Sequence, residues 1–325
     1  MTVTLDHVQD AARRIAGHVV RTPMLRDDGL SVRLGQPVWM KCEYRQTTGA
    51  FKLRGATNAL LSLPPEALAR GVVTASTGNH GRALAHAARA LGVPATVCLS
   101  RLVPANKVQA IRDLGAEVRI IGASQDEAMA EVARAVAEEE MAEIPPFDHT
   151  EVVAGQGTLG IEILEECPTV GTLLIPLSGG GLAAGIAVAA KALNPRVRVI
   201  GVSMERGAAM AASLKVGHPV DVVEEATLAD SLGGGIGLKN RVTFDLCRVL
   251  LDDTILVTEA EIAEAMRHLG RAGHVVEGAA AVGHAALLSG KVRPDGPVVA
   301  LLSGGNIEPS LHARIMAGAN AVEPA

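Results

Sequence analysis

The fold is decided by residues 172–192, TLLIPLSGGGLAAGIAVAAKA, in which an apolar run, a glycine turn and an alanine-rich run follow one another. The apolar run is short enough for a buried strand, and residues 182–192 have the length of a helix. The glycines between them let the backbone turn sharply and approach a ligand closely. This stretch therefore predicts a strand–turn–helix unit of an α/β fold.

The same alternation continues on both sides of this unit. Strands are predicted at 72–75, 94–100, 117–121, 197–202 and 298–302, and helices at 82–91, 107–114, 125–140, 160–166 and 259–269. Such alternation indicates parallel βαβ units. Pro145 and Pro146 interrupt it and mark a crossing between domains. We predict a large domain from 1–68 and 149–325, and a small inserted domain from 69–148.

Size and composition exclude several classes of protein. The 325 residues suggest about two domains, and a net charge of −5 without a block of lysine or arginine argues against nucleic-acid binding. No stretch reaches the roughly 20 apolar residues of a membrane span, and the N-terminus lacks an apolar signal core. The four cysteines are scattered without metal-ligand spacing. We expect a soluble, cytoplasmic protein that binds a small molecule.

The glycine turn at 178–182 is suited to a phosphate dianion, because its amides and the following helix N-terminus present positive charge. Two other interpretations remain open. The turn could bind no ligand, or Gly179, Gly181 and Gly185 could imitate a dinucleotide loop, with Glu205 as the ribose-binding acid. Their spacing is one residue too long for the dinucleotide motif.

Lys52 lies in the run 48–56, TGAFKLRGA, behind an aromatic residue and among small ones. That is an unusual setting for a solvated lysine, although a structural role is possible. A lysine amine forms Schiff bases with carbonyl cofactors when part of it is unprotonated. Together with the glycine turn, Lys52 predicts a phosphorylated cofactor that carries a carbonyl group. A nicotinamide cofactor would leave Lys52 without a role.

Two further turns follow predicted strands. The first, STGNHG at 76–81, offers donors for a carboxylate, or else it is a simple helix-capping cluster. In it, His80 suits either acid–base chemistry or a structural hydrogen bond. The second turn carries Ser303, whose hydroxyl could bond a heterocyclic nitrogen. Because ligands collect at the carboxyl ends of parallel strands, we expect these turns and Lys52 to form one site.

These motifs, in this order, resemble those of the fold-type II pyridoxal phosphate enzymes, in the branch of threonine dehydratases and serine racemases. The matching stretches are 41–58, 76–92, 154–163, 175–201 and 301–306, which span nearly the whole chain. The resemblance implies a tryptophan synthase beta-like α/β fold, with two open parallel-sheet domains and the cofactor in the cleft between them. It also implies a homodimer.

The resemblance implies a role for each candidate site residue. Lys52 would carry pyridoxal 5′-phosphate as a Schiff base, Phe51 would pack beside the ring, Asn79 would bond the ring hydroxyl and Ser303 the ring nitrogen. The phosphate would be held by Gly179, Gly180, Gly181 and Leu182. The substrate would be bound by Ser76, Thr77, Gly78, Asn79 and His80, and its distal group by His149, for which a structural role is an equal alternative.

The implied activity is β-elimination from a β-hydroxy-α-amino acid, which gives a 2-oxo acid and ammonia. Residues 228–238, LADSLGGGIGL, and 101–104, RLVP, look like those of the hydroxyectoine utilization dehydratases. A general threonine/serine dehydratase and a serine racemase remain alternatives, although Thr77 stands where racemases place a serine. Alternatives from other classes are a nicotinamide-dependent oxidoreductase and a non-catalytic binding protein. The family's cation site would include Glu205, but no second acid appears before Pro219, so no metal is assigned.

Overall fold

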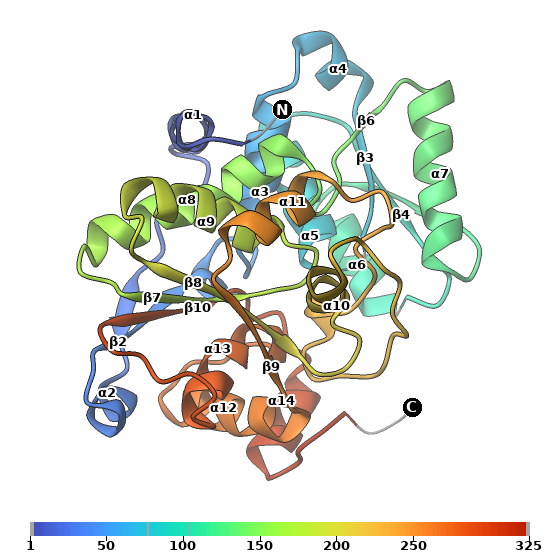
Figure 1. The fold of residues 1–325 in the computed structure, drawn as a ribbon. Helices are drawn as coiled ribbons and strands as arrows, with labels where there is room; N and C mark the ends of the chain where they lie inside the picture. The colour runs from blue at the N-terminus through green and yellow to red at the C-terminus, as the bar shows by residue number, and fades with distance from the viewer. Residues whose placement is uncertain (1–2, 77, 104, 323–325) are drawn as a thin grey trace.

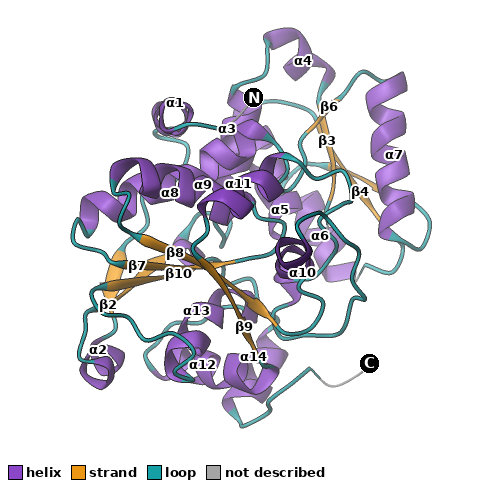
Figure 2. Cartoon of the chain, viewed as in Figure 1, coloured by secondary structure: helices purple, strands orange, loops and turns teal. Residues whose placement is uncertain are grey.

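The computed structural model describes residues 3–76, 78–103 and 105–322. Within them, two sheets flanked by helices form an α/β fold (Figures 1 and 2). The larger sheet has the strand order β1-β2-β10-β7-β8-β9, and the smaller sheet the order β5-β4-β3-β6. The predicted class of fold is confirmed.

The larger sheet is built from both ends of the chain. Its strands are β1 (Met24–Arg26), β2 (Val38–Cys42), β7 (Thr172–Pro176), β8 (Arg198–Met204), β9 (Asp253–Val257) and β10 (Val298–Leu302). Neighbouring strands are parallel, except that β1 runs antiparallel to β2. Strands β7 and β10 are buried along their whole length, as expected where helices cover both faces of a parallel sheet.

The smaller sheet comes from one continuous stretch of chain. Its strands, all parallel, are β3 (Val72–Ala75), β4 (Ala95–Leu99), β5 (Glu117–Ile120) and β6 (Ala142–Glu143). In the chain they are inserted between β2 and β7 of the larger sheet. Leu53 and Leu60 nevertheless share an apolar cluster with Leu84 and Val97. Residues before 69 thus pack against the smaller sheet, although the predicted boundary at 68 assigns them to the large domain. The domain boundaries at 68 and 148 therefore remain a prediction.

Fourteen α-helices lie in the described part of the chain. They are α1 (Leu5–Ile15), α2 (Asp28–Leu34), α3 (Lys52–Leu61), α4 (Pro65–Arg70), α5 (Asn79–Leu91), α6 (Ala105–Asp113), α7 (Gln125–Glu138), α8 (Thr150–Glu166), α9 (Gly181–Leu193), α10 (Ala209–Val216), α11 (Val242–Leu250), α12 (Glu259–Arg271), α13 (Gly278–Leu288) and α14 (Pro309–Met316). In Figure 1, α8, α9 and α11 lie on one side of the larger sheet, and α12, α13 and α14 on the other. Short 3₁₀ turns occur at η1 (Glu43–Arg45) and η2 (Asp230–Leu232).

Several helices begin earlier than the sequence predicted, and the differences are largest for α5 and α8. Helix α5 begins at Asn79 and not at residue 82, which places Asn79 and His80 in its first turn. Helix α8 begins at Thr150 and not at residue 160. Every residue from 152 to 160 is buried, and glycines in this stretch allow close contact with α9. For this reason no one-sided apolar pattern marks this part of the helix.

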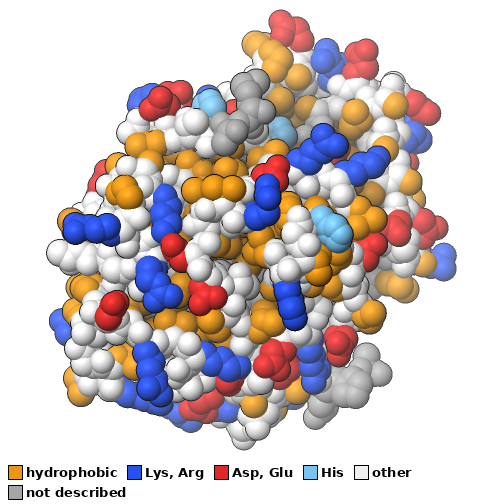
Figure 3. All heavy atoms as spheres, in the orientation of Figure 1, with side chains coloured by type: hydrophobic (Ala, Val, Ile, Leu, Met, Phe, Trp, Pro, Cys, Tyr) orange, Lys and Arg blue, Asp and Glu red, His pale blue; other side chains and the backbone are white. Residues whose placement is uncertain are grey.

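On the face shown in Figure 3, acidic and basic side chains are interspersed. No helix among the described residues is long and apolar enough to cross a membrane.

Candidate active site

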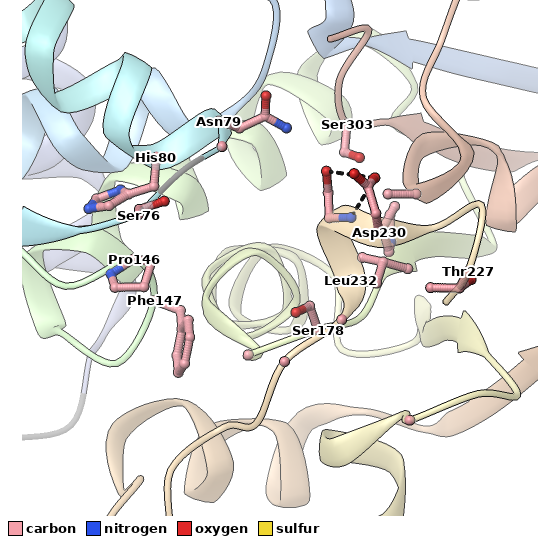
Figure 4. Close-up of a pocket in the computed structure, with 18 of the residues that line it drawn as sticks. Ser76, Asn79, His80, Pro146, Phe147, Ser178, Thr227, Asp230, Leu232 and Ser303 are labelled. Carbon is pink, nitrogen blue, oxygen red and sulfur yellow. Dashed lines mark hydrogen bonds between the residues drawn. The ribbon is translucent and has the colours of Figure 1, made fainter. Parts of the chain in front are cut away.

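A cavity of about 700 Å³ opens beside the turns that follow β3, β7 and β10. These turns lie at the carboxyl ends of parallel strands, where α/β folds usually bind ligands. Most of the predicted site residues line the cavity, namely Phe51, Lys52, Ser76, Gly78, Asn79, His80, Gly179, Gly180, Gly181, Leu182 and Ser303. Thr77 lies outside the described residues. Figure 4 shows Ser76, Asn79 and His80 on one side of the cavity and Thr227, Asp230 and Leu232 on the other.

Lys52 is the first residue of α3, and its surroundings hold it firmly. Its Nζ donates a hydrogen bond to the carbonyl oxygen of Pro146 at 2.6 Å. The preceding backbone N–H, that of Phe51, donates to the carbonyl of Ser303 at 3.0 Å, which ties the start of α3 to the turn after β10. The lysine amine therefore reaches the cavity from a fixed backbone.

Burial lowers the pKa of Lys52 to about 8, against the opposing effect of the Glu277 carboxylate. The positive N-terminal end of α3 also disfavours the ammonium form, and so it acts in the same direction as burial. A substantial fraction of the amine is thus unprotonated in mildly alkaline solution. That state is the one needed for Schiff-base formation and for general-base catalysis.

The glycine turn after β7 has the geometry that the sequence suggested. Gly180 has a φ of 88° and forms the N-cap of α9, which begins at Gly181. A Cβ at Gly179 would come within 2.4 Å of the Phe147 ring, so only glycine fits beneath that ring. The first backbone amides of α9 have no partner within the helix and are suited to a phosphate dianion.

Ser303 and His80 have clear but different environments. Ser303 follows the last strand of the larger sheet and is 3% exposed. His80 donates from Nε2 to the carbonyl of Ile144 at 2.8 Å, if that nitrogen carries the proton. Burial and the nearby Lys52 lower the pKa of His80 to about 3, so its ring is neutral near pH 7. This favours the structural interpretation of His80 over an acid–base role.

Asn79 is held by a residue that the sequence analysis missed. Its Nδ2 donates to both carboxylate oxygens of Glu277, at 2.9 and 3.2 Å. Glu277 is 4% exposed and also lines the cavity. The available signal was a single acid in the run 275–288, whose other residues are apolar except for His284, and an acid is unusual in a buried segment.

His149 lies at a helix start and is absent from the described residues that line the cavity. It is the N-cap of α8, where its Nδ1 accepts a hydrogen bond from the backbone N–H of Glu151 at 3.3 Å. This capping contact explains the residue without a substrate. The expected contact of His149 with the substrate's distal group gains no support from this position.

Residues 224–235 form a cavity wall that the sequence analysis did not predict, since it noted only residues 228–238 and only for their resemblance to the hydroxyectoine utilization dehydratases. Three carboxylates of this segment line the cavity, those of Glu224, Glu225 and Asp230. Its backbone is anchored by Glu259, which accepts hydrogen bonds from Thr227 Oγ1 and from the backbone N–H of Leu228. The wall is therefore acidic and fixed at one end.

Glu205, for which the resemblance implied a place in a cation site, lies directly after β8. Its carboxylate is 3.6 Å from the ammonium of Lys291, which also pairs with Glu261 at 2.8 Å. Across residues 3–76, 78–103 and 105–322, no group of three or more His, Cys, Asp or Glu residues is arranged to hold a metal ion.

The donors around the cavity fit a phosphorylated pyridine aldehyde. They comprise a lysine of lowered pKa, a glycine turn at a helix N-terminus, a buried serine hydroxyl and a fixed asparagine amide. A family model described as pyridoxal-phosphate dependent enzyme matches residues 15–304. The chain therefore belongs to this family, and its cofactor is pyridoxal 5′-phosphate.

Individual relatives place the chain in the threonine dehydratase-like branch of the family. A protein of Sinorhizobium fredii, provisionally named a threonine dehydratase, is 56% identical over 97% of this chain and 96% of its own. The catabolic L-threonine dehydratase of Escherichia coli is 40% identical, with coverages of 97% and 96%. The structure of maize serine racemase superposes with a TM-score of 0.92 at 33% identity and covers 98% of both chains.

Proposed function

We propose that this protein is a dehydratase that eliminates water from a β-hydroxy-α-amino acid, after which hydrolysis of the resulting enamine takes up water and releases ammonia, so that the net products are a 2-oxo acid and ammonia. The observation that carries the proposal is the position of Lys52, whose amine enters the same cavity as the 178–182 turn and Ser303. The similarity to proteins named threonine dehydratases and ammonia-lyases supports the same type of reaction.

The side chains have distinct tasks in this proposal. Lys52, which would hold the cofactor through its amine, would accept the Cα proton on Nζ when that amine is free. The hydroxyl and amide donors at Ser76 and Gly78 and the first turn of α5 bind the substrate carboxylate. Bound pyridoxal phosphate supplies the electron sink that makes the Cα proton acidic. Ser303 is a neutral partner for the ring nitrogen, which moderates that sink and favours loss of the β-hydroxyl.

The proposed substrate is a hydroxylated 2,4-diaminobutyrate derivative formed in hydroxyectoine catabolism. The carboxylates of Glu224, Glu225 and Asp230 in the cavity wall support it, because they attract a distal ammonium group. A neutral acylated amine would gain little from this wall. We therefore propose that the free amine is used in preference to its N-acetyl form.

Release of 2-oxo acid by the holoenzyme tests both the proposed reaction and the proposed substrate. The substrates compared are L-threonine, L-serine, threo-3-hydroxyaspartate, 3-hydroxy-2,4-diaminobutyrate and its N-acetyl form. A higher kcat/KM for the free diamine supports the hydroxyectoine role. A preference for threonine or serine makes the protein a general dehydratase, and inactivity on all five contradicts the proposed reaction.

Racemisation is the second candidate, favoured by the close superposition on maize serine racemase. Chiral analysis of the same L-serine reaction separates the two activities, because a racemase forms D-serine with little 2-oxo acid. Trapping of the cofactor on Lys52 with borohydride separates both activities from that of a nicotinamide-dependent oxidoreductase.

We also propose that the protein is a homodimer, as the family resemblance implies, and that it lies in the cytoplasm. Sedimentation equilibrium checks the assembly.

A further inference from the structure

Glu277 lies at the start of α13, but its side chain does not cap that helix. It is the N-cap residue of α13, a position where a carboxylate commonly accepts a bond from the first turn. Here the side chain makes no such bond. Its backbone N–H instead donates to the carbonyl of Gly304 at 3.1 Å, and its carboxylate is directed at Asn79. The usual structural reason for an acid at this position is therefore absent.

The hydrogen bonds around Asn79 allow its amide only one orientation. Nδ2 donates to Glu277, while Oδ1 accepts from Asn306 Nδ2 at 2.6 Å. Asn306 Nδ2 also donates to the carbonyl of Thr48, at 3.0 Å. Flipping the Asn79 amide would place its oxygen against a carboxylate and its nitrogen against another donor, and both contacts are repulsive. Glu277 thus determines which end of the amide carries the protons.

An amide nitrogen has two protons, and one of them can serve both Glu277 oxygens, at 2.9 and 3.2 Å, as a bifurcated hydrogen bond. The second is available to an acceptor in the cavity that Asn79 lines. The turn after β10 leaves room for this arrangement, since a Cβ at Gly304 would lie 2.6 Å from Glu277 Oε1. The Glu277 carboxylate can therefore occupy this position only because residue 304 is a glycine.

We propose that Glu277 is the positioning residue that fixes the Asn79 amide and directs its second N–H group at the ring hydroxyl of pyridoxal phosphate. This inference rests on the role proposed for Asn79 at the cofactor, and it does not depend on the identity of the substrate. It gives a cofactor-related task to a buried acid whose side chain does not cap its own helix.

Cofactor binding to the apoenzyme provides the test, in a double-mutant cycle. Wild type, Glu277→Gln, Asn79→Ala and the double variant are titrated with pyridoxal phosphate, and the visible absorbance band of each loaded protein is recorded. We expect each single change to weaken binding about tenfold and to shift the band. We expect the double variant to bind no more weakly than Asn79→Ala, because Glu277 acts through Asn79.

The control is Glu264→Gln, which removes a half-exposed carboxylate from α12 and should leave affinity and band unchanged. Additive losses in the double variant, or a wild-type affinity and band for Glu277→Gln, would overturn the inference. Thermal unfolding of each apoenzyme reports whether it is folded. If the Glu277→Gln apoenzyme is not folded, the variants Glu277→Asp and Gly304→Ala replace it in the titration. Both of them move the carboxylate and keep its charge. Normal binding by these two variants also contradicts the proposal. No substrate is added, so an incorrect substrate assignment cannot change these results.

Discussion

At the scale of single residues, the function depends on the environment that Lys52 has in the fold. Its identity was visible in the sequence, but the extent of its pKa shift was not, because burial lowers the pKa while the carboxylate of the distant Glu277 opposes that change. Glu277 itself was missed for the same reason. It is separated from Asn79 by 198 positions in the chain, and no local pattern connects the two residues.

Replacing Lys52 by alanine should reduce turnover by at least about 10³-fold, since both the covalent attachment and the proton acceptor are lost. Circular dichroism and 2-oxo acid assays on the same preparation check this. Arg45→Ala, an exposed change on η1, serves as a control and should leave turnover unaffected. Substantial remaining elimination by Lys52→Ala would disprove the proposed mechanism.

The lowered pKa of Lys52 also predicts a pH-dependent stability. Between about 8 and the ordinary value of 10.5, the unfolded chain binds more protons at this position than the folded chain does. The free energy of unfolding therefore rises with pH across this interval. The apoenzyme variant Lys52→Met should be more stable than wild type at pH 7, and its advantage should shrink from pH 8 to pH 10. Urea denaturation at several pH values measures this, and a constant advantage would contradict it.

At the scale of elements, strands β3 and β10 were predicted with their observed bounds because they are short apolar runs bounded by glycine, proline or polar residues. Strand β2 was not predicted. It contains Lys41, which is fully buried and pairs with Glu162 of α8 at 2.8 Å, so a charged residue lies where a strand of this sheet is expected to be apolar. Only the tertiary structure supplies its partner.

The contact between α8 and α9 gives a prediction at this scale. A Cβ at Gly185 would lie 2.3 Å from the carbonyl oxygen of Val153 and 2.7 Å from the backbone nitrogen of Gly157. Gly185 therefore serves helix packing, and not the dinucleotide loop considered from the sequence. Gly185→Ala should lower the free energy of unfolding by about 1–3 kcal/mol, because the helices must separate. Gly296→Ala, at a position with open space, is the matched control in urea denaturation. Equal stabilities would show that the helices adapt without cost.

At the scale of the whole molecule, the start of α3 is held by a buried ion-pair cluster. Arg54 and Glu43 are both fully buried, with Arg54 Nε 2.9 Å from Glu43 Oε2 and Arg54 Nη1 2.6 Å from Glu162 Oε1. The cluster joins α3, η1 and α8, and so fixes the helix that carries Lys52. The sequence showed Arg54 only as a residue of the lysine motif, because its partners come from two distant segments.

Removing one member of this cluster should be strongly destabilising. Glu43→Ala leaves Arg54 without one of its buried partners and should cost about 3–5 kcal/mol in urea denaturation. The combined variant Glu43→Met with Arg54→Met removes both charges and should recover much of that loss. A double variant as unstable as Glu43→Ala would mean that packing, and not the uncompensated charge, determines the loss.

The strand order of the larger sheet has a consequence for biosynthesis. Strand β10 pairs with β2 on one side and β7 on the other, yet it is the last strand to be synthesised. The four strands of the smaller sheet are complete by residue 143, and that unit can begin to fold while the ribosome is still translating. The gap between β2 and β7 is closed only when residues 298–302 emerge. Ser303 follows at once, so the nascent chain cannot acquire a complete cofactor site until residues 298–303 have emerged.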